Sequence, residues 1–282
     1  MSPLAIDLYC GLGGWSSALL AEGWDTVGFD IEQHVYGAHR YPAQLVLQDV
    51  RTIHGRQFKD AALIVCSPPC QEFSYMAMPW SRAKQIRRAL RGEGDFPEGY
   101  TGSRTVAELT ALFDACFRIQ AEASEAAGRH IPLVVENVRG AQEWVGRARW
   151  RFGSFYLWGD VPALMPMTGQ RAKVGGLDWS KWQEPDYRTS GAGGCFRDSA
   201  TKNAGGSWFN IAHNTTSGVG RNPVHELNER GVKSFTPQGQ PLGQNEAARK
   251  YGSQSPQRKM ASAMIAKIPE RLARHIARVY RP

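Results

Sequence analysis

Short apolar runs alternate with helical patterns over the first half of the chain. Runs that are rich in β-branched residues and bounded by turn residues predict buried strands. They occupy residues 4–9, 26–30, 61–67 and 132–138. Residues 15–22 and 106–123 have helical spacing instead, and the apolar positions of the longer segment are Val106, Leu109, Phe113, Cys116 and Phe117. Strands that alternate with helices predict an α/β fold, with a largely parallel sheet covered by helices on both faces.

The pattern changes after about residue 165. Residues 168–256 are rich in Gly, Ser, Asn, Thr and Gln and show little periodicity, whereas residues 257–281 are helical again. Leu272, Ile276 and Val279 form the apolar face of this last helix, which predicts that it packs on the first domain. The predicted parts are an α/β domain at 1–165, an irregular region at 166–255 and a returning C-terminal helix at 256–282.

Composition restricts the class of protein. The 282 residues are 42% hydrophobic and 21% charged, as in ordinary globular proteins, and their net charge of +8 favours a polyanionic partner such as nucleic acid. No apolar run approaches the ~20 residues that span a bilayer, and the first residues, MSPLAIDLYC, do not resemble a signal peptide. Five scattered cysteines do not suggest a disulfide framework, so we expect a cytoplasmic protein with reduced thiols and no membrane segment.

A glycine-rich turn, GLGG at 11–14, follows the first predicted strand and precedes a helix. This arrangement lets backbone N–H groups approach a ligand closely, and an acid that ends the next strand, here Asp30, typically holds ribose hydroxyls. Ser16 stands where the dinucleotide-binding form of the turn has its third glycine. On the residues alone, the segment is either a cofactor loop or an ordinary tight turn.

A cysteine, Cys70, follows a stiff Pro-Pro pair at the end of the third predicted strand. Proline fixes φ, so the thiol is held at the carboxyl edge of the sheet, where open α/β sheets bind their ligands. A thiol placed there is a candidate nucleophile. The alternative is a structural cysteine, which is our interpretation of Cys10, Cys116 and Cys195. No companion Cys/His pair has the spacing of metal ligands, so we expect no metal site.

Glu136 and Asn137 lie at the end of the fourth predicted strand, in VVENV at 134–138. A buried carboxylate is costly unless it has partners or a chemical task. If burial raises its pKa, a protonated Glu136 can donate a hydrogen bond to a substrate. The alternative is a strand-end acid with no such role.

Together, three segments resemble the DNA cytosine-5 methyltransferase family of bacterial and phage type: DLYCGLGG (7–14), SPPCQEFS (67–74) and ENV (136–138). Their order and spacing agree with those of the family. The resemblance implies a Rossmann-like S-adenosylmethionine-dependent methyltransferase sheet at 1–165 and a small irregular target-recognition region at 166–255. It implies S-adenosylmethionine as cofactor and double-stranded DNA as partner, and we expect a monomer.

The resemblance also implies which residues hold the cofactor. Residues 7–14 would surround its methionine part, Asp30 would bind the ribose, Ile31 would lie beside the adenine and Asp49 near the adenine amino group. The implied cofactor residues are Asp7, Leu8, Cys10, Gly11, Gly13, Gly14, Asp30, Ile31, Asp49, Val50 and Pro68.

The implied reaction is methyl transfer to carbon 5 of a cytosine flipped out of the duplex. Cys70 would attack C6, which makes the ring enamine-like at C5, while Glu136 would contact N3 and the exocyclic amino group. A base that the sequence does not identify would then remove the C5 proton before Cys70 leaves. The implied substrate-binding residues are Ser67, Pro69, Gln71 and Asn137.

Two segments depart from the family's pattern. Arg149 and Arg151 are candidates for the catalytic arginine segment Gln-x-Arg-x-Arg, with a basic loop touching phosphates as the alternative. AKIP at 266–269 replaces an Asn-x-Val-Pro-like turn. Between the motifs, residues 75–104 are interpreted as a long basic loop that could close over DNA, with a solvated basic helix around 81–91 as the alternative.

Two other functions stay open at this point. The first is an RNA cytosine-5 methyltransferase that acts on transfer RNA, because Pro-Pro-Cys-Gln does not distinguish the two substrates. The second is a non-catalytic DNA-binding homologue, although the presence of both Cys70 and Glu136 argues against it. A plain dehydrogenase leaves both of these residues unexplained.

Overall fold

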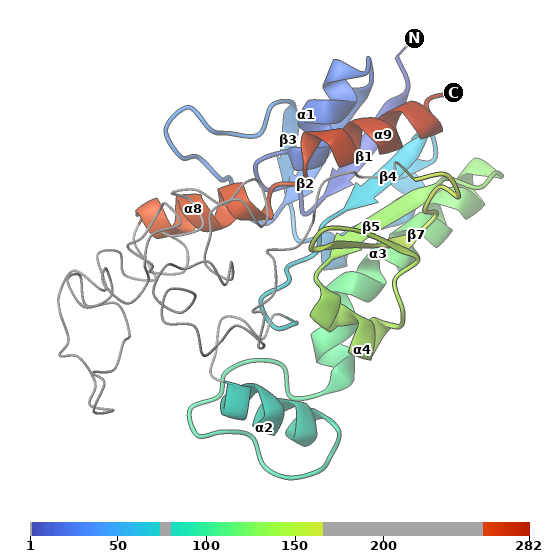
Figure 1. The fold of residues 1–282 in the computed structure, drawn as a ribbon. Coiled ribbons are helices and arrows are strands. Elements are labelled where there is room, and N and C mark those ends of the chain that lie inside the picture. Colours follow the sequence, from blue (N-terminus) through green and yellow to red (C-terminus); the bar gives the residue numbers. More distant parts are fainter. Residues whose placement is uncertain (1, 74–79, 166–255) are drawn as a thin grey trace, which may run out of the picture. The chain divides into compact units, whose positions relative to one another are not determined.

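The structure is a computed structural model that describes residues 2–73, 80–165 and 256–282 (Figure 1). The chain divides into two compact units, one formed by Met1–Pro166 with Ile268–Pro282 and the other by Met167–Lys267. The described part of the second unit is helix α8 (Pro256–Ala266) with Lys267. The predicted target-recognition region and Cys195 lie outside the described residues, so the predicted three-part division stays a prediction.

The first unit is built on a seven-stranded sheet with the order β3-β2-β1-β4-β5-β7-β6 (Figure 1). The strands are β1 (Leu4–Leu8), β2 (Asp25–Asp30), β3 (Gln44–Leu47), β4 (Leu63–Cys66), β5 (Leu133–Asn137), β6 (Trp150–Phe152) and β7 (Phe155–Gly159). The pairs among β1 to β5 are all parallel, and β7 is antiparallel to both of its neighbours. The predicted α/β class with a largely parallel sheet is therefore confirmed.

Helices cover both faces of the sheet: α1 (Gly14–Ala21) and α9 (Glu270–Tyr280) lie on one face and α3 (Val106–Ala127) on the other. The unit also contains α2 (Trp80–Leu90), α4 (Gln142–Val145) and short 3-10 helices at Val50–Thr52, Gly55–Phe58 and Arg139–Ala141. On one face, Leu8, Cys66 and Val135 pack with α3. On the other face, Val65 and Val134 pack with α1 and α9. Successive strand residues point to opposite faces, so the central strands β1, β4 and β5 contribute to both cores.

Helix α3 begins and ends at residues with clear capping roles. The Thr105 hydroxyl accepts a hydrogen bond from the Glu108 N–H, and Gly128 adopts a left-handed conformation after the last turn. The predicted apolar face is buried at Leu109, Phe113 and Cys116. Val106 and Phe117, which were predicted on the same face, are each 37% exposed, because they lie at the margin of the apolar stripe.

The single predicted C-terminal helix is two helices, α8 and α9, separated at Pro269. Proline has no N–H to continue a helical ladder, and Pro269 is the N-cap residue of α9. Leu272 and Ile276 are fully buried against α1, as predicted, but Val279 is 48% exposed and does not belong to the buried face. At the surface, Glu22 at the end of α1 accepts hydrogen bonds from the guanidinium groups of Arg274 and Arg278.

The predicted long loop at 75–104 instead contains a helix, α2. Its apolar positions Ala83, Ile86 and Ala89 are buried. The guanidinium groups of Arg87 and Arg91 bind the carboxylate of Glu143 in α4, and Arg91 also lies over the ring of Trp144, 5.7 Å from the ring centroid. The basic helix that was the alternative interpretation is therefore present, with part of its charge already paired within the protein.

Helix α9 should contribute strongly to the stability of the first unit. Leu272→Ala removes a fully buried side chain and leaves a cavity, so we expect the free energy of unfolding to fall by about 2–5 kcal/mol. Val279→Ala in the same helix is the matched control, with an expected change within about 0.5 kcal/mol. Urea denaturation followed by far-UV circular dichroism measures both. Equal effects of the two substitutions would show that α9 does not pack on α1 in solution.

Candidate active site

The predicted site residues gather at the carboxyl ends of the five parallel strands. In sheet order, Asp49 follows β3, Asp30 ends β2, the glycine turn follows β1, Cys70 follows β4 and Glu136 lies at the end of β5. Parallel strands place their carboxyl ends at one edge of a sheet, and this edge is where open α/β sheets bind ligands. One half of this edge, at β3, β2 and β1, therefore carries Asp49, Asp30 and the glycine turn. The other half, at β4 and β5, carries Cys70 and Glu136.

The turn after β1 has an unusual backbone. Gly11 and Gly13 have φ angles of +50° and +70°, and Tyr9, which is not glycine, has φ +57°. A Cβ on Gly13 would lie 2.4 Å from Cδ of Pro42, whereas a Cβ on Gly11 would have nothing within 4 Å. The Tyr9 hydroxyl anchors the turn by donating to the carbonyl of Leu112, 2.8 Å away. The backbone is thus open to a ligand at Gly11 and tightly packed at Gly13.

Asp7 lies beneath this turn and is 1% exposed. Its Oδ2 accepts a hydrogen bond of 2.7 Å from the Ser16 hydroxyl, which is also 2.7 Å from the Tyr41 hydroxyl. Its Oδ1 has no hydrogen-bond partner among the described residues. Burial raises the pKa of the Asp7 carboxyl to about 8, so the group is mostly protonated at neutral pH. The side chains of the neighbouring predicted residues Leu8 and Cys10 are also buried.

Asp30 is the charged acid of this edge. Burial alone would raise its pKa, but hydrogen bonds from His34 and from the N–H groups of Gly11 and Glu32 lower the pKa below its ordinary value. Its Oδ2 accepts from Gly11 N–H at 2.9 Å and its Oδ1 accepts from Ile31 N–H at 2.8 Å. The carboxylate thereby fixes the glycine turn to the end of β2, and the Ile31 side chain beside it is 70% exposed.

Asp49 caps the 3-10 helix that begins at Val50. Its Oδ1 accepts from Arg51 N–H at 2.9 Å, and the Arg51 guanidinium binds both carboxylate oxygens, which lowers the pKa of Asp49. Each carboxylate oxygen of Asp49 accepts two hydrogen bonds from Arg51, so its acceptor positions are used within this segment. Val50 is buried at 2% exposure, so its side chain belongs to the core.

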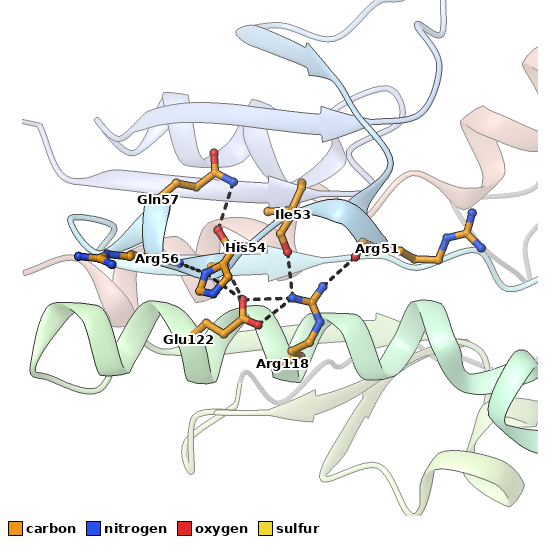
Figure 2. A network of polar contacts seen from close by, with 8 residues as sticks. Arg51, Ile53, His54, Arg56, Gln57, Arg118 and Glu122 are labelled. Atoms are coloured by element: carbon orange, nitrogen blue, oxygen red, sulfur yellow. Dashed lines mark hydrogen bonds and ion pairs between the residues drawn. The ribbon is translucent and has the colours of Figure 1, made fainter.

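A polar network from α3 fixes the segment that carries Asp49 (Figure 2). The Arg118 guanidinium donates to the carbonyls of Ile53 at 2.9 Å and of Arg51 at 3.2 Å, and it also binds Glu122. Glu122 in turn accepts from Gly55 N–H at 2.6 Å. The segment between β3 and β4 is therefore held to the helix by its own backbone groups.

The loop after β4 is held from several elements. Ser67 N–H donates to the carbonyl of Leu8 at 3.1 Å, and the indole N–H of Trp15 donates to the Ser67 hydroxyl at 3.0 Å. The side-chain amide of Asn137 donates to the carbonyl of Pro68 at 3.0 Å. Cys70, at the end of this loop, carries a thiol of intermediate exposure. Sequence reasoning missed Trp15, which is the first residue of the predicted helix and belongs to none of the motifs.

The other predicted residues of this loop differ in exposure. Pro68 is buried, whereas Pro69 and Gln71 are exposed. Glu72 accepts a hydrogen bond from Ser103 N–H at 3.0 Å and a second from the Ser103 hydroxyl. The segment before α3 is thereby held to the loop after β4. Ser74 lies outside the described residues.

Glu136 and Asn137 are both buried, at 8% and 1% exposure. The Asn137 oxygen accepts from Val138 N–H at 2.8 Å, and its amide holds Pro68, so both polar atoms are already bound within the protein. The substrate-binding role that the resemblance implies for Asn137 stays a prediction. In the structure its side chain holds the loop after β4.

Arg149 and Arg151 are not brought to Glu136 by the sheet. Arg151 in β6 lies opposite Tyr156 in β7, and Tyr156 lies opposite Asn137 in β5. Glu136 lies opposite the next residue of β7, Leu157. Because side chains alternate along a strand, Arg151 lies on the sheet face opposite to Glu136. Arg151 lies 3.4 Å from the Tyr156 hydroxyl, and both arginines are exposed. Their positions fit the alternative of a basic surface better than a direct role beside Glu136.

The residues at this edge fit an adenosyl cofactor. Asp30 presents a charged carboxylate at the end of β2, where such an acid holds ribose hydroxyls. Ile31 and Leu47 are exposed by 70% and 58%, and large apolar side chains at such exposure offer a surface that an adenine ring can cover. The open backbone at Gly11 lies next to this acid, since the two are hydrogen-bonded.

The described residues contain no group of three or more His, Cys, Asp or Glu side chains that could hold a metal ion. Within the same residues, none of the helices is long and apolar enough to span a bilayer.

The sheet has a reversed strand, β7, between β5 and β6, and a glycine turn follows β1. This arrangement is the Rossmann-like sheet of S-adenosylmethionine-dependent methyltransferases, the fold class predicted above. Residues 4–85 match the family model of C-5 cytosine-specific DNA methylases, the family that the motifs resemble. The match includes the glycine turn and Cys70, and it ends before Glu136. Among curated proteins, none matches the sequence significantly.

Several solved structures share part of the fold. A protein from E. coli described as a prophage-encoded DNA modification methyltransferase is 21% identical, over 50% of this chain and 33% of that one, with a TM-score of 0.31. The S. pombe Dnmt2 methyltransferase is 16% identical (52% and 37% coverage, TM-score 0.30). The Entamoeba histolytica methyltransferase EhMeth is 15% identical (52% and 41%, TM-score 0.31). The aligned part thus spans well under half of these chains, and such TM-scores add nothing to what the sheet itself shows.

The buried Asp7 predicts a pH-dependent stability. Its pKa is about 8 in the folded protein and 3.8 ordinarily, so folding takes up a proton between these values and stability falls as pH rises from about 4 to 8. Asp7→Asn cannot titrate. Relative to the native protein, its free energy of unfolding should therefore rise with pH by up to about 1.4 kcal/mol per unit, and level off above pH 8.

Urea denaturation of both proteins at several pH values, without ligand, measures this difference. A constant difference between pH 4 and 8 would show that Asp7 is ionised in the folded state. Ser16→Ala, which removes the hydrogen bond to Oδ2 and leaves the carboxyl in place, is the control that should keep the pH dependence.

Proposed function

We propose that the protein transfers a methyl group from S-adenosylmethionine to carbon 5 of cytosine in double-stranded DNA. The observation that carries the proposal is the order of groups along one sheet edge. A charged acid and a glycine turn lie at β2 and β1, and a thiol and a buried acid lie at the neighbouring β4 and β5. The family match over residues 4–85 supports cytosine as the base.

The substrate class rests on weaker support. The net charge of +8 suits a polyanion, and Lys84 and Arg88 are exposed on α2, away from its buried face. We propose duplex DNA, with the target cytosine extruded so that its C6 reaches Cys70. We further propose that the protein acts in the cytoplasm as a monomer. A reducing compartment would keep Cys70 as a thiol, as it is in the structure.

The chemistry follows from what each group can do. Bound S-adenosylmethionine supplies the electrophilic methyl group. The Cys70 sulfur forms a bond to C6, and the electrons of the C5–C6 double bond become available at C5. Glu136 in its acid form shares a proton with N3 and so stabilises the charge that the addition places on the ring. After C5 is methylated, a base removes the C5 proton, the double bond re-forms and the Cys70 sulfur leaves.

The central test is mass spectrometry of nucleosides from mixed-sequence duplex DNA incubated with the protein and S-adenosylmethionine. We expect 5-methylcytosine with the native protein and none with Cys70→Ser, because a hydroxyl is a far weaker nucleophile than a thiolate. Glu136→Gln should slow turnover by about 10²–10⁴-fold, the usual range for losing a general acid. Transfer RNA is assayed in parallel. Product on RNA alone would replace the DNA proposal, and product on neither would point to a binding protein.

The cofactor site is tested separately by calorimetry. Asp30→Ala removes a charged acceptor of ribose hydroxyls, and we expect the dissociation constant of S-adenosylmethionine to rise about 10- to 100-fold. Because Asp30 also fixes Gly11, Asp30→Asn is the companion variant that keeps the side-chain volume. Glu32→Ala, at an exposed neighbouring acid, is the control that should bind normally. Unchanged affinity in Asp30→Ala would remove this acid from the site.

A further inference from the structure

We infer that Trp15 is a positioning residue that couples the glycine-turn helix to the nucleophile loop. The inference rests on the proposed function, since it concerns where Cys70 is held relative to the cofactor turn. Trp15 is the second residue of α1, directly after GLGG, and is 2% exposed. A buried indole N–H needs an acceptor, and this one donates to the hydroxyl of Ser67 at 3.0 Å.

Few backbone donors precede Cys70 in the loop after β4. Pro68 and Pro69 have no N–H groups, so backbone donors are missing from the two residues that precede Cys70. Ser67 supplies the last backbone donor before the two prolines, and its N–H binds the carbonyl of Leu8 in β1. Two side chains also hold this part of the loop, since Trp15 donates to the Ser67 hydroxyl and Asn137 donates to the Pro68 carbonyl.

These two side-chain contacts come from opposite faces of the sheet. Trp15 packs in the core that contains Val65 and Val134. Asn137 lies on the other face, because it shares the parity of Val135 along β5. The base of the nucleophile loop is therefore clamped from α1 on one side and from β5 on the other.

The contact from α1 has a specific consequence. Residues 11–14 and the loop 67–70 come from different strands, and the Trp15–Ser67 bond is a direct side-chain link between the helix of the first and the base of the second. A displacement of about 1 Å between a nucleophile and the group it serves can cost about 10²-fold in rate. Losing the link should therefore lower the rate of methyl transfer while leaving the protein folded.

A double-mutant cycle tests the coupling. Trp15→Phe keeps an aromatic ring without the N–H, and Ser67→Ala removes the acceptor. We expect each to lower the single-turnover rate of methyl transfer about tenfold, with the double variant no slower than either single one, because all three lose the same bond. The dissociation constant of S-adenosylmethionine should stay within about twofold. Additive losses in the double variant would overturn the inference.

Trp24→Phe is the matched control. Trp24 is also 2% exposed, and its indole N–H donates at 3.1 Å to the carbonyl of Ala277 in α9, away from the nucleophile loop. It should lower the melting temperature as Trp15→Phe does and leave the transfer rate unchanged. If Trp24→Phe slows transfer as much as Trp15→Phe does, Trp15 has only a general structural role.

A second readout does not depend on activity. The rate at which iodoacetamide alkylates Cys70, followed by mass spectrometry of its peptide, reports how firmly the loop is held. We expect this rate to change several-fold in Trp15→Phe and in Ser67→Ala but not in Trp24→Phe. Unchanged alkylation in the first two variants would overturn the inference. Absence of methyl transfer by the native protein, with altered alkylation in these variants, would reject the proposed function and leave the coupling intact.

Discussion

The parallel pairing of β1 with β4 is the constraint on which the candidate site depends. Leu8 lies opposite Cys66, and the ladder ends with the bond from Ser67 N–H to the Leu8 carbonyl. The chain then leaves these two strands toward opposite faces, since α1 packs on one face and α3 on the other. Ligands of open α/β sheets bind where the direction of the connections reverses in this way. The glycine turn and the Cys70 loop meet at this point because of strand order.

Two carboxyl groups near the glycine turn differ in charge because their hydrogen bonds differ. Asp7 receives one hydroxyl and is otherwise enclosed, so burial dominates and its pKa rises to about 8. Asp30 is less enclosed and accepts from the backbone N–H groups of Gly11, Ile31 and Glu32 and from His34, so its pKa is lowered. The acid that can reach a ligand is therefore the charged one, while the neutral acid lies under the turn. Residue type alone does not separate these two roles.

The elements predicted from the sequence were those whose burial is uniform. β4 and β5 are buried at every position, so their apolar runs stand out. β3 is a half-exposed edge strand and β6 has three residues, so neither gives a pattern long enough to recognise. Within α2, the basic residues outnumber the three buried alanine and isoleucine positions, which hid its periodicity. The break at Pro269 was readable from proline chemistry but was overlooked between two helical patterns.

The site residues followed a similar division. Those carried by motifs were found, because their spacing from strand ends is local information. The contacts that fix them were not found, since Trp15–Ser67 and Asn137–Pro68 join residues that lie 52 and 69 positions apart and depend on strand pairing. The roles of Arg149 and Arg151 in a catalytic arginine segment stay predictions. The alternation of β6 places Arg151 on the sheet face opposite to Glu136, which spacing along the chain does not show.

Strand pairing places Glu136 next to the segment that matches the family model. The match ends at residue 85, before β5, so by itself it says nothing of Glu136. In the sheet, Val135 pairs with Cys66, which brings Glu136 level with Ser67 and Asn137 level with Pro68. The Asn137–Pro68 hydrogen bond forms in this register.

A shift of β5 by one residue would exchange the faces of Glu136 and Asn137. The amide would then lie where the acid now lies, and its hydrogen bond to the loop after β4 would be lost. The buried hydrogen bond and the position of the acid therefore depend on the same register, which is why Glu136 belongs to the proposed mechanism even though it lies outside the matched segment.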